Sequence, residues 1–485
     1  MNILLSFQTL HDSKVFDEII NLSLDKNIDT IYIVSSLMND VDINTITKYN
    51  NINKLTYINS NTLFDNKCFS QNIFNLKKQD ISNNNDLYIN YISSFRWVPI
   101  SIKKEIDTWT FSISMHYDIL NFWNNFFSMN QIDSVILLND EHSSLDKILI
   151  DTAKKYSINN IVTASIIGAN ASEGEEYFAF YNSNENDYTN LSKLKNNLQM
   201  KRNTLKDNDF KTFSDEYNNN ASKFKFYITK LYELLNDNIS IVSKLKILIN
   251  KLYNKIYTSF YLQKQLKYIE SLKVHYKNIS QDPKDGKTYV YYCLHFDPEA
   301  TTLPKDNDYS NQLLNIRIIA SSLPKDWILY VKEHPHQLDC NLYKNIFLNQ
   351  LHNIELFRSK SFYNYINNLN NVMLLSLSSN HKELIQNAQY IVSNTGTVFR
   401  EATYMNKECM TFSEKSIYEK LNNIHKVNDL DSCKQVFSNQ SVSKVSDIDE
   451  IFDKYSITIT DINKRDVDIL RFIIKKILFK DNYND

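Results

Sequence analysis

The sequence predicts an α/β protein with two domains built on parallel sheets, and three observations support this fold class. Short apolar runs alternate with helix-like segments in residues 1–181, and the same alternation returns in residues 287–460. Residues 182–286 between them have a helical, basic character, and residues 461–485 contain an amphipathic helix. Strand and helix signals at this spacing imply parallel sheets with right-handed crossovers. We therefore expect two such domains, a helical insertion between them, and a C-terminal helix that packs back on the first domain.

In the first domain, four apolar runs are expected to be strands: Ile3–Phe7, Ile31–Ser35, Ser134–Leu138 and Asn160–Ser165. A helix is expected to start at Ser143, because Asp146 three residues later completes a capping pattern. Residues 40–127 show an irregular pattern and predict no definite element.

In the second domain, the expected strands are Thr288–Leu294, Trp327–Lys332, Val372–Leu375 and Tyr390–Ser393. Helices fit at Asn311–Ser321, Tyr343–Leu351 and His381–Ala388. The C-terminal helix is predicted by an apolar stripe at helical spacing that contains Val467, Leu470, Ile473, Ile474, Ile477 and Leu478.

The composition excludes several classes of protein. The 485 residues include 54 Lys and Arg against 56 Asp and Glu, a balance that argues against general nucleic-acid binding. The five cysteines have no metal-binding spacing, which favours a reducing, cytoplasmic compartment. The N-terminus is typical of a first strand and not of a signal peptide. No apolar run approaches the roughly 18 residues that a membrane span needs.

Glycine is scarce in this chain, and one glycine lies in a polar turn. The chain has four glycines, and Gly396 lies in Ser393–Thr397, between an apolar run and a helix-like stretch. A strand, a tight turn and a helix start form a phosphate cradle, because the first N–H groups of the helix and the Thr hydroxyls point toward one anion. A simple turn is the plainer interpretation.

Two more polar segments follow predicted strands: Cys293–Thr302 and Lys332–Pro335. The carboxyl ends of parallel strands form the ligand-binding edge of such a sheet, so all three segments are expected to meet there. Taken singly, these segments are weak signals. A lone histidine is more often a surface residue, and Glu401 can be explained simply as an acid that stabilises the helix dipole. Together they favour a nucleotide site.

These segments resemble those of bacterial capsule and surface-polysaccharide biosynthesis glycosyltransferases, including the Kdo-transferring capsule proteins. The similar residues are Leu294, His295, Pro298, Glu299 and Thr302, then Tyr330–Pro335, then Asn394–Thr397 with Glu401 and Ala402. The resemblance covers mainly residues 287–415. It implies the GT-B arrangement of two facing Rossmann-like domains. It also implies a glycosyltransferase that moves a sugar from a nucleotide-sugar donor, with CMP-sugar favoured, to a surface glycan or glycolipid.

By this resemblance the donor binds the second domain, with no further cofactor and no metal. His334 would contact the phosphate of the leaving nucleotide, and an imidazolium there would stabilise the developing charge. Glu401 would accept hydrogen bonds from the ribose. Arg400 departs from the apolar residue expected at its position and could instead reach the phosphates. The expected donor-binding residues are His295, Glu299, Lys332, His334, Pro335, Ser393, Thr395, Gly396, Thr397 and Glu401.

The general base is expected to come from the first domain. Asp140, Glu141 and His142 follow a predicted strand, as acid–base catalysts often do, although helix capping explains them equally well. Arg96 and Trp97 could bind an acceptor sugar, but ordinary packing is the simpler account. Four D-x-D patterns occur, at 40–42, 429–431, 447–449 and 466–468, and we attribute them to chance in an acid-rich chain.

Residues 221–280 contain 11 lysines and three acids. A helical insertion with solvated lysines is the first interpretation, and peripheral contact with an anionic membrane on the inner face of the cell is the second. Two other functions stay open. These are teichoic-acid-type polyol-phosphate transfer and a non-catalytic scaffold of a capsule-assembly complex, which would bind no nucleotide. A sugar-nucleotide 2-epimerase would share the fold, but it is expected to be shorter and to lack the basic helical insertion.

Overall fold

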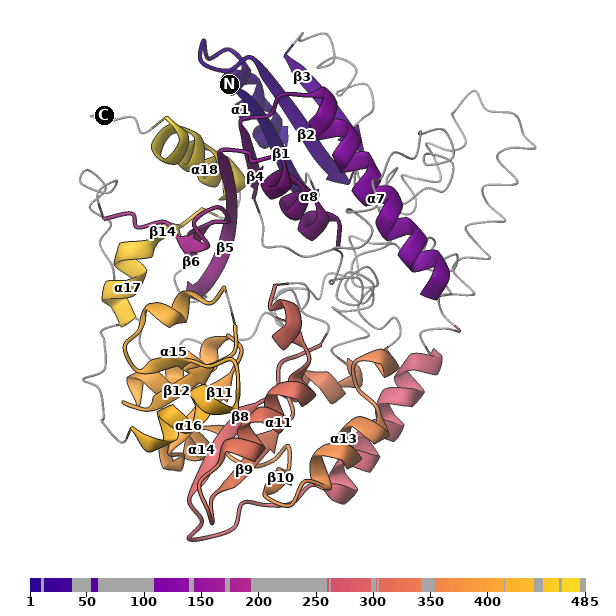
Figure 1. Cartoon of the computed structure of the whole chain (residues 1–485), viewed down its shortest axis with the longest axis vertical. Helices are drawn as coiled ribbons and strands as arrows, with labels where there is room; N and C mark the ends of the chain where they lie inside the picture. The colour runs from indigo at the N-terminus through magenta and orange to yellow at the C-terminus, as the bar shows by residue number, and fades with distance from the viewer. Residues whose placement is uncertain are drawn as a thin grey trace.

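Two β-sheets organise the part of the chain that the structure describes. The computed structural model describes residues 1–9, 13–36, 54–59, 109–138, 144–170, 175–192, 260, 263–297, 302, 305–341, 354–413, 415–439, 448–461 and 465–479. The sheets belong to two domains, drawn in indigo to magenta above and in orange below in Figure 1. The predicted fold class, two Rossmann-like α/β domains, is confirmed.

The second sheet has six parallel strands in the order β10-β9-β8-β11-β12-β13. Numbered from β8, this is the 3-2-1-4-5-6 order of a Rossmann fold. The chain moves outward from β8 in one direction and then returns to place β11 on its other side. The strands are β8 (Tyr289–Cys293), β9 (Ile328–Lys332), β10 (Val372–Leu374), β11 (Tyr390–Ser393), β12 (Glu408–Thr411) and β13 (Ile424–Lys426).

Helices cover both faces of this sheet because successive strand side chains point to opposite faces. Tyr289 and Tyr291 of β8 pack with α14 (His381–Asn387) and α15 (Thr397–Tyr404). Val290 and Tyr292 pack on the other face. That face is covered by helical residues 263–279 and by α11 (Gln312–Ser322), α13 (Lys360–Asn367) and α16 (Leu430–Ser438).

The first sheet has the order β14-β6-β5-β4-β1-β2-β3, and β7 pairs with β6. Strands β5, β4, β1, β2 and β3 are parallel, whereas β6, β7 and β14 run antiparallel to their neighbours. The strands are β1 (Asn2–Thr9), β2 (Thr30–Ser36), β3 (Leu55–Asn59), β4 (Ser134–Leu137), β5 (Asn160–Asn170), β6 (Glu175–Asn182), β7 (Asp187–Tyr188) and β14 (Ser456–Ile459).

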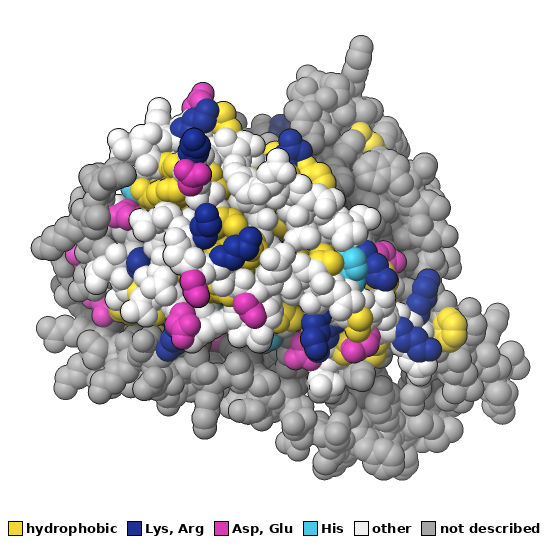
Figure 2. All heavy atoms as spheres, turned by 90° about the horizontal axis from the view of Figure 1, so that it is seen from below, with side chains coloured by type: hydrophobic (Ala, Val, Ile, Leu, Met, Phe, Trp, Pro, Cys, Tyr) yellow, Lys and Arg dark blue, Asp and Glu magenta, His cyan; other side chains and the backbone are white. Residues whose placement is uncertain are grey.

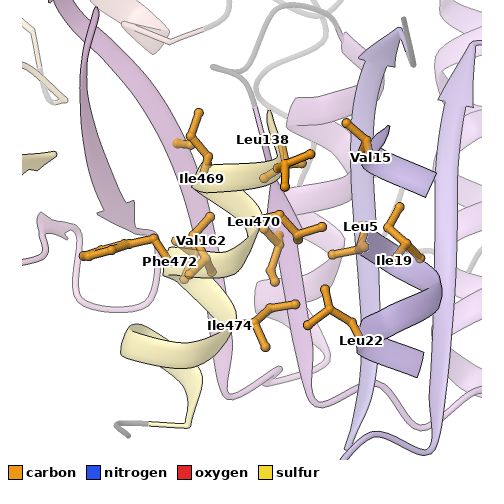
Figure 3. Close-up of a cluster of buried hydrophobic side chains, with 14 of the residues drawn as sticks. Leu5, Val15, Ile19, Leu22, Leu138, Val162, Ile469, Leu470, Phe472 and Ile474 are labelled. Atoms are coloured by element: carbon orange, nitrogen blue, oxygen red, sulfur yellow. The ribbon is translucent and has the colours of Figure 1, made fainter. Parts of the chain in front are cut away.

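Helices from both ends of the chain cover one face of the first sheet. Here α1 (Ser13–Ser23) lies beside α18 (Arg465–Phe472), which continues as a π-helix over Ile473–Leu478. Figure 3 shows Leu470 and Ile474 directed toward Leu5 and Leu22. Arg471 also pairs with Glu18 at 2.6 Å. The predicted C-terminal helix therefore packs back on the first domain. The other face carries α7 (Trp109–Met129) and α8 (Ser144–Lys155).

The expected domain boundaries need two corrections. The chain re-enters the first sheet at Ser456, where β14 pairs with β6 after α17 (Ile448–Tyr455), so the return begins before residue 461. Helical residues 263–279 belong to the second domain because Leu272 and Tyr276 are buried in its core. The Tyr276 hydroxyl donates to the Leu375 carbonyl at 2.6 Å. Residues 193–259 of the expected insertion, and most of the predicted helix Tyr343–Leu351, lie outside the described residues.

The domains meet where β6 and β7 contact residues 415–420. The Tyr188 hydroxyl donates to the Lys415 carbonyl at 2.7 Å, and Lys420 pairs with Asp187. Within the described ranges, no helix is long and apolar enough to cross a membrane.

Candidate functional site

A cavity of about 420 Å³ lies at the carboxyl ends of β8, β9 and β11. Its position follows from the strand order. Since β8 is followed outward by β9 on one side and flanked by β11 on the other, the loops after β8 and β11 diverge and leave a crevice between them. In open α/β sheets this switch point is where ligands bind.

The cavity brings together most of the residues that the sequence predicted. Those that line it are His295, Lys332, His334, Pro335, Ser393, Thr395, Gly396 and Thr397. Glu401 lies beside it, 3.4 Å from the lining residue His381. Glu299 lies outside the described residues, as do Asp140, Glu141, His142, Arg96 and Trp97, so their expected roles stay predictions.

His295 is held inside the turn that follows β11. Its Nε2 accepts hydrogen bonds from the backbone N–H groups of Asn394 at 3.2 Å and Thr395 at 3.1 Å. Two backbone donors at Nε2 require an unprotonated nitrogen there, and burial lowers the pKa of His295 to about 4. These two N–H groups precede the helix, already have an acceptor and are not free for an anion.

The N-terminus of α15 has backbone N–H groups that can bind an anion. Gly396, Thr397 and Val398 line the cavity, and the first N–H groups of any α-helix have no acceptor within the helix. The Gly396 backbone has φ 109° and ψ 175°, a conformation found almost only in glycine. Because of this conformation the chain can leave β11 and enter α15 across a single residue. The helix N-terminus with the two Thr hydroxyls remains suited to a phosphate.

Lys332 and His334 supply side chains from the end of β9. The buried Lys332 ammonium donates to the Ser379 carbonyl at 2.8 Å, which leaves two of its three donors. His334 accepts the His336 backbone N–H at its Nδ1, 3.2 Å away. Burial and the neighbouring His336, His295, Arg358 and His381 lower the pKa of His334 to about 3. The expected imidazolium is therefore corrected to a neutral imidazole, which donates through Nε2–H.

A buried arginine that sequence reasoning missed joins two of these loops. Arg358 is 1% exposed and pairs with Asp297 at 2.7 Å and with Glu333 at 2.6 Å. It also donates to the His295 carbonyl at 2.8 Å. Glu333 in turn accepts the His334 N–H at 2.8 Å and the Tyr363 hydroxyl at 2.6 Å. Arg358 thus fixes both histidine-bearing loops from beneath the cavity.

A second buried network holds the turn from below. The Asn394 side-chain amide donates to Asp306 and accepts from Asn315, at 2.8 and 2.9 Å. Ser413 also donates to Asp306. Asp306 is fully buried, and burial raises its pKa to about 7. Asn394 therefore acts on the cavity through the backbone that it positions.

Other sequence candidates lie elsewhere. Arg400 is buried within α15 and is not among the residues that line the cavity, so it does not reach a phosphate there. Asp429, of one D-x-D pattern, caps α16 by accepting from the Ser432 N–H at 2.8 Å. Asp466 and Asp468 lie in the first turn of α18. The pattern at 40–42 is outside the described residues.

No family model matches this chain, and none of the curated proteins matches its sequence. Among solved structures, it is similar to UDP-GlcNAc 2-epimerase from Methanocaldococcus jannaschii, with 10% identity, a TM-score of 0.22, and coverage of 98% of this chain and 99% of that one. The Neisseria meningitidis UDP-GlcNAc 2-epimerase bound to UDP-GlcNAc has 11% identity, a TM-score of 0.23, and coverage of 98% and 100%. A lipopolysaccharide outer core galactosyltransferase in its apo form has 8% identity, a TM-score of 0.19, and coverage of 85% and 80%. At such low values the likeness carries no weight for activity.

Proposed function

We propose that the protein is a glycosyltransferase that binds a nucleotide-sugar donor in the cavity of the second domain and transfers its sugar to a surface glycan or glycolipid. The observation that carries the proposal is the placement of anion-binding groups at the switch point of a Rossmann sheet. Three loops contribute there, after β8, β9 and β11. The resemblance of the same loops to capsule glycosyltransferases supports this choice of reaction.

The chemistry of transfer assigns roles to these groups. Breaking the bond between the anomeric carbon and the phosphate oxygen leaves negative charge on the departing nucleotide. Donors already aimed at that phosphate lower the barrier, because they need no reorganisation during the reaction. In this proposal the start of α15, the hydroxyls of Thr395 and Thr397, and the Nε2–H of His334 donate to the phosphate, while Lys332 supplies positive charge.

The charge of the cavity favours a donor with one phosphate. Lys332 is the only Lys or Arg among the residues described as lining it, and the lowered pKa values of His295 and His334 keep both rings neutral at pH 7. The carboxylate of Glu333, which also lines the cavity, is balanced by its ion pair with the buried Arg358. One positive charge balances the single phosphodiester of a CMP-sugar more closely than the two phosphates of a UDP-sugar. The CMP-sugar favoured by the resemblance therefore stays the preferred donor.

The acceptor side of the proposal involves the first domain and the basic segment 221–280. The acid–base group Asp140, Glu141 and His142 lies after β4 in the first domain, outside the described residues. Peripheral membrane contact, which would bring a lipid-linked glycan close, is proposed for the basic segment 221–280. Lys264, Lys267, Lys273 and Lys277 are exposed on its described helix. Figure 2 shows basic and acidic side chains interspersed over the described face of the second domain seen from below, so this face has no area of one charge sign.

The proposal is tested by calorimetric titration with CMP, CDP, UDP and GDP. We expect one of them to bind, and we expect His334→Ala to weaken that binding by about 10- to 100-fold, the loss expected for a hydrogen bond to a charged group. The matched control is His275→Ala, since His275 contacts Asn364 away from the cavity. If none of the four nucleotides binds the wild-type protein, the scaffold alternative replaces this proposal.

A further inference from the structure

A fully buried carboxyl group supports the turn that follows β11. It belongs to Asp306, which precedes a 3₁₀-helix over Asn307–Ser310. An acid at this position usually accepts from a backbone N–H of the helix, but the Asp306 side chain makes no such bond. Its oxygens accept instead from the Asn394 side chain at 2.8 Å and from the Ser413 hydroxyl. The carboxyl group therefore holds the turn and not the helix that it precedes.

Asn394 links this carboxyl group to the cavity. All four of its polar groups are bonded. The side-chain nitrogen donates to Asp306, and the side-chain oxygen accepts from Asn315 at 2.9 Å. The backbone N–H donates to His295 at 3.2 Å, and the backbone carbonyl accepts from the Thr411 hydroxyl. Since His295 lines the cavity, Asp306 is connected to the cavity wall through the single residue Asn394.

Asp306 forms no ion pair with the residues that the structure describes, because both of its donors are neutral. Three titratable groups influence it or are influenced by it: Lys305 of its own loop, Lys415 after β12, and Tyr292 of β8. Burial raises the pKa of Tyr292, so this hydroxyl stays neutral. The two lysines favour the ionised carboxylate, but burial outweighs them and raises the pKa of Asp306 to about 7.

Both protonation states of Asp306 preserve the turn. In the ionised form, the Ser413 hydroxyl donates to Asp306 Oδ1. In the protonated form, Oδ1 carries the proton and can donate to the Ser413 oxygen instead. The Asn394 amide donates to Oδ2 in either form. Protonation therefore changes the charge behind the turn and leaves its hydrogen bonds in place.

A buried negative charge at this position opposes a phosphate in the cavity. Like charges repel more strongly where water is excluded, and each charge disfavours the ionised form of the other group. Thr395 lines the cavity and directly follows Asn394, the residue to which Asp306 is bonded. The neutral form of Asp306 is therefore the form that suits a bound nucleotide.

We propose that Asp306 is a positioning residue of the turn after β11 and holds a proton while a nucleotide is bound, so that nucleotide binding takes up a proton above neutral pH. This rests on the nucleotide-sugar function proposed above. The sign follows from linkage, because a bound phosphate raises the pKa of Asp306 above its value of about 7 in the free protein. Affinity is then highest below about pH 7 and falls as the pH rises through that pKa.

The first measurement needs only the wild-type protein. CMP, CDP, UDP and GDP are titrated by calorimetry at pH 8 in buffers of different ionisation enthalpy, and the dependence of the binding enthalpy on the buffer gives the number of protons taken up. At this pH a nucleotide phosphate is already ionised. We expect an uptake of about half a proton for each nucleotide bound, because the nearby phosphate raises the pKa of Asp306 by about one to two. An uptake of zero overturns the proposal.

The second measurement compares affinities at pH 6 and pH 8.5. The wild type should lose about five- to twentyfold over this range. Asp306→Asn places a donor and an acceptor in the pattern of the protonated acid, so it should match the wild type at pH 6 and should not share this loss. Asp306→Ala removes an acceptor of the Asn394 amide and should weaken binding at both pH values. The control is Glu408→Gln, since Glu408 of β12 pairs with His425 at 2.7 Å and does not line the cavity. It should follow the wild type, and the ionisation of the nucleotide itself is common to all four proteins.

The outcomes are distinct. If Asp306→Asn loses affinity with pH as steeply as the wild type, the proposal is overturned, although the proposed function stands because a nucleotide binds. If Asp306→Asn binds as weakly as Asp306→Ala at both pH values, the ionised carboxylate is needed and the proposal is again overturned. If none of the four nucleotides binds the wild type, the proposed function fails and this inference fails with it.

Discussion

Replacing Gly396 by alanine tests whether the turn after β11 shapes the nucleotide site. Its φ of 109° and ψ of 175° lie where residues with a side chain are strained by about 1–3 kcal/mol. The added Cβ would lie 3.6 Å from His295 Cε1, an ordinary contact distance. The cost therefore comes from the backbone and not from a lack of space. Relief of the strain requires rotation about Gly396, which moves the start of α15 relative to the Ser393–Thr395 segment.

Two measurements follow from this geometry. In urea unfolding, Gly396→Ala should lose about 1–3 kcal/mol of stability. In calorimetry its affinity for the best nucleotide should fall by about tenfold or more, because the N–H groups and Thr hydroxyls no longer converge.

Gly286→Ala is the control. Gly286 also has a positive φ, 70°, and no atom lies within 4 Å of the added Cβ. This variant should lose a comparable 1–2 kcal/mol, roughly, and keep its affinity. A Gly396→Ala protein with wild-type affinity would refute the assignment of this turn as a phosphate contact.

Four further expectations follow from the buried groups and from the proposed chemistry. Arg358→Met leaves two buried carboxylates without their partner and should lower the free energy of unfolding in urea by about 3–5 kcal/mol. The control Arg317→Met, at an exposed arginine, should change it by less than about 1 kcal/mol. Equal effects of the two substitutions would contradict the role of Arg358. The raised pKa of Asp306 means that the folded state holds its proton up to about pH 7 while the unfolded state releases it near 3.8. Stability should thus fall as pH rises from about 4 to about 7, by at most about 1.4 kcal/mol per pH unit, and Asp306→Asn should remove this dependence, as unfolding midpoints at several pH values would show. Leu470→Ala should cost about 2–5 kcal/mol, since Leu470 is fully buried in the first core; a loss below about 1 kcal/mol would contradict that packing. Transfer of sugar should persist in EDTA, and strict dependence on Mg²⁺ or Mn²⁺ would redirect attention to Asp40 and Asp42.

Much of the second domain could be predicted from the sequence because its central strands are buried on both faces. The runs that became β8, β9 and β11 are continuously apolar, and the residues after them are polar, which is the signature of a strand entering a binding loop. The strands β12 and β13 were missed because polar residues interrupt their apolar pattern: β12 begins at Glu408 and ends at Thr411, and β13 ends in the exposed Lys426.

The residues that line and support the cavity were harder to predict. Eight of the expected donor-binding residues line it, since each lies at the end of a strand or within a few residues after it, and strand order brings these ends together. Arg358 could not be recognised in this way, because it gains its role from partners on other elements. Arg358 acts through residues 25 and 61 positions away, and nothing in the local sequence marks it as different from an ordinary surface arginine.

The protonation states were also beyond the sequence. His334 is typical of a phosphate-binding cation when only its motif is considered. Its burial and the four basic side chains near it, His336, His295, Arg358 and His381, lower its pKa, and its Nδ1 accepts the His336 N–H, so the neutral ring is the stable form. The same holds for Asp306, which has no motif at all and whose pKa depends on complete exclusion from water.

The return of the chain to the first sheet has a consequence for synthesis on the ribosome. The described residues of the second domain all lie between positions 263 and 439, so this domain can form most of its core before the last part of the chain emerges. The first domain begins at Asn2 but obtains β14 and α18 only from residues 456–472. Its apolar face, with Leu5 and Ile19, stays uncovered throughout translation of the second domain. The domain made first is therefore completed last, and until β14 and α18 emerge its incompletely covered apolar surface is exposed to aggregation.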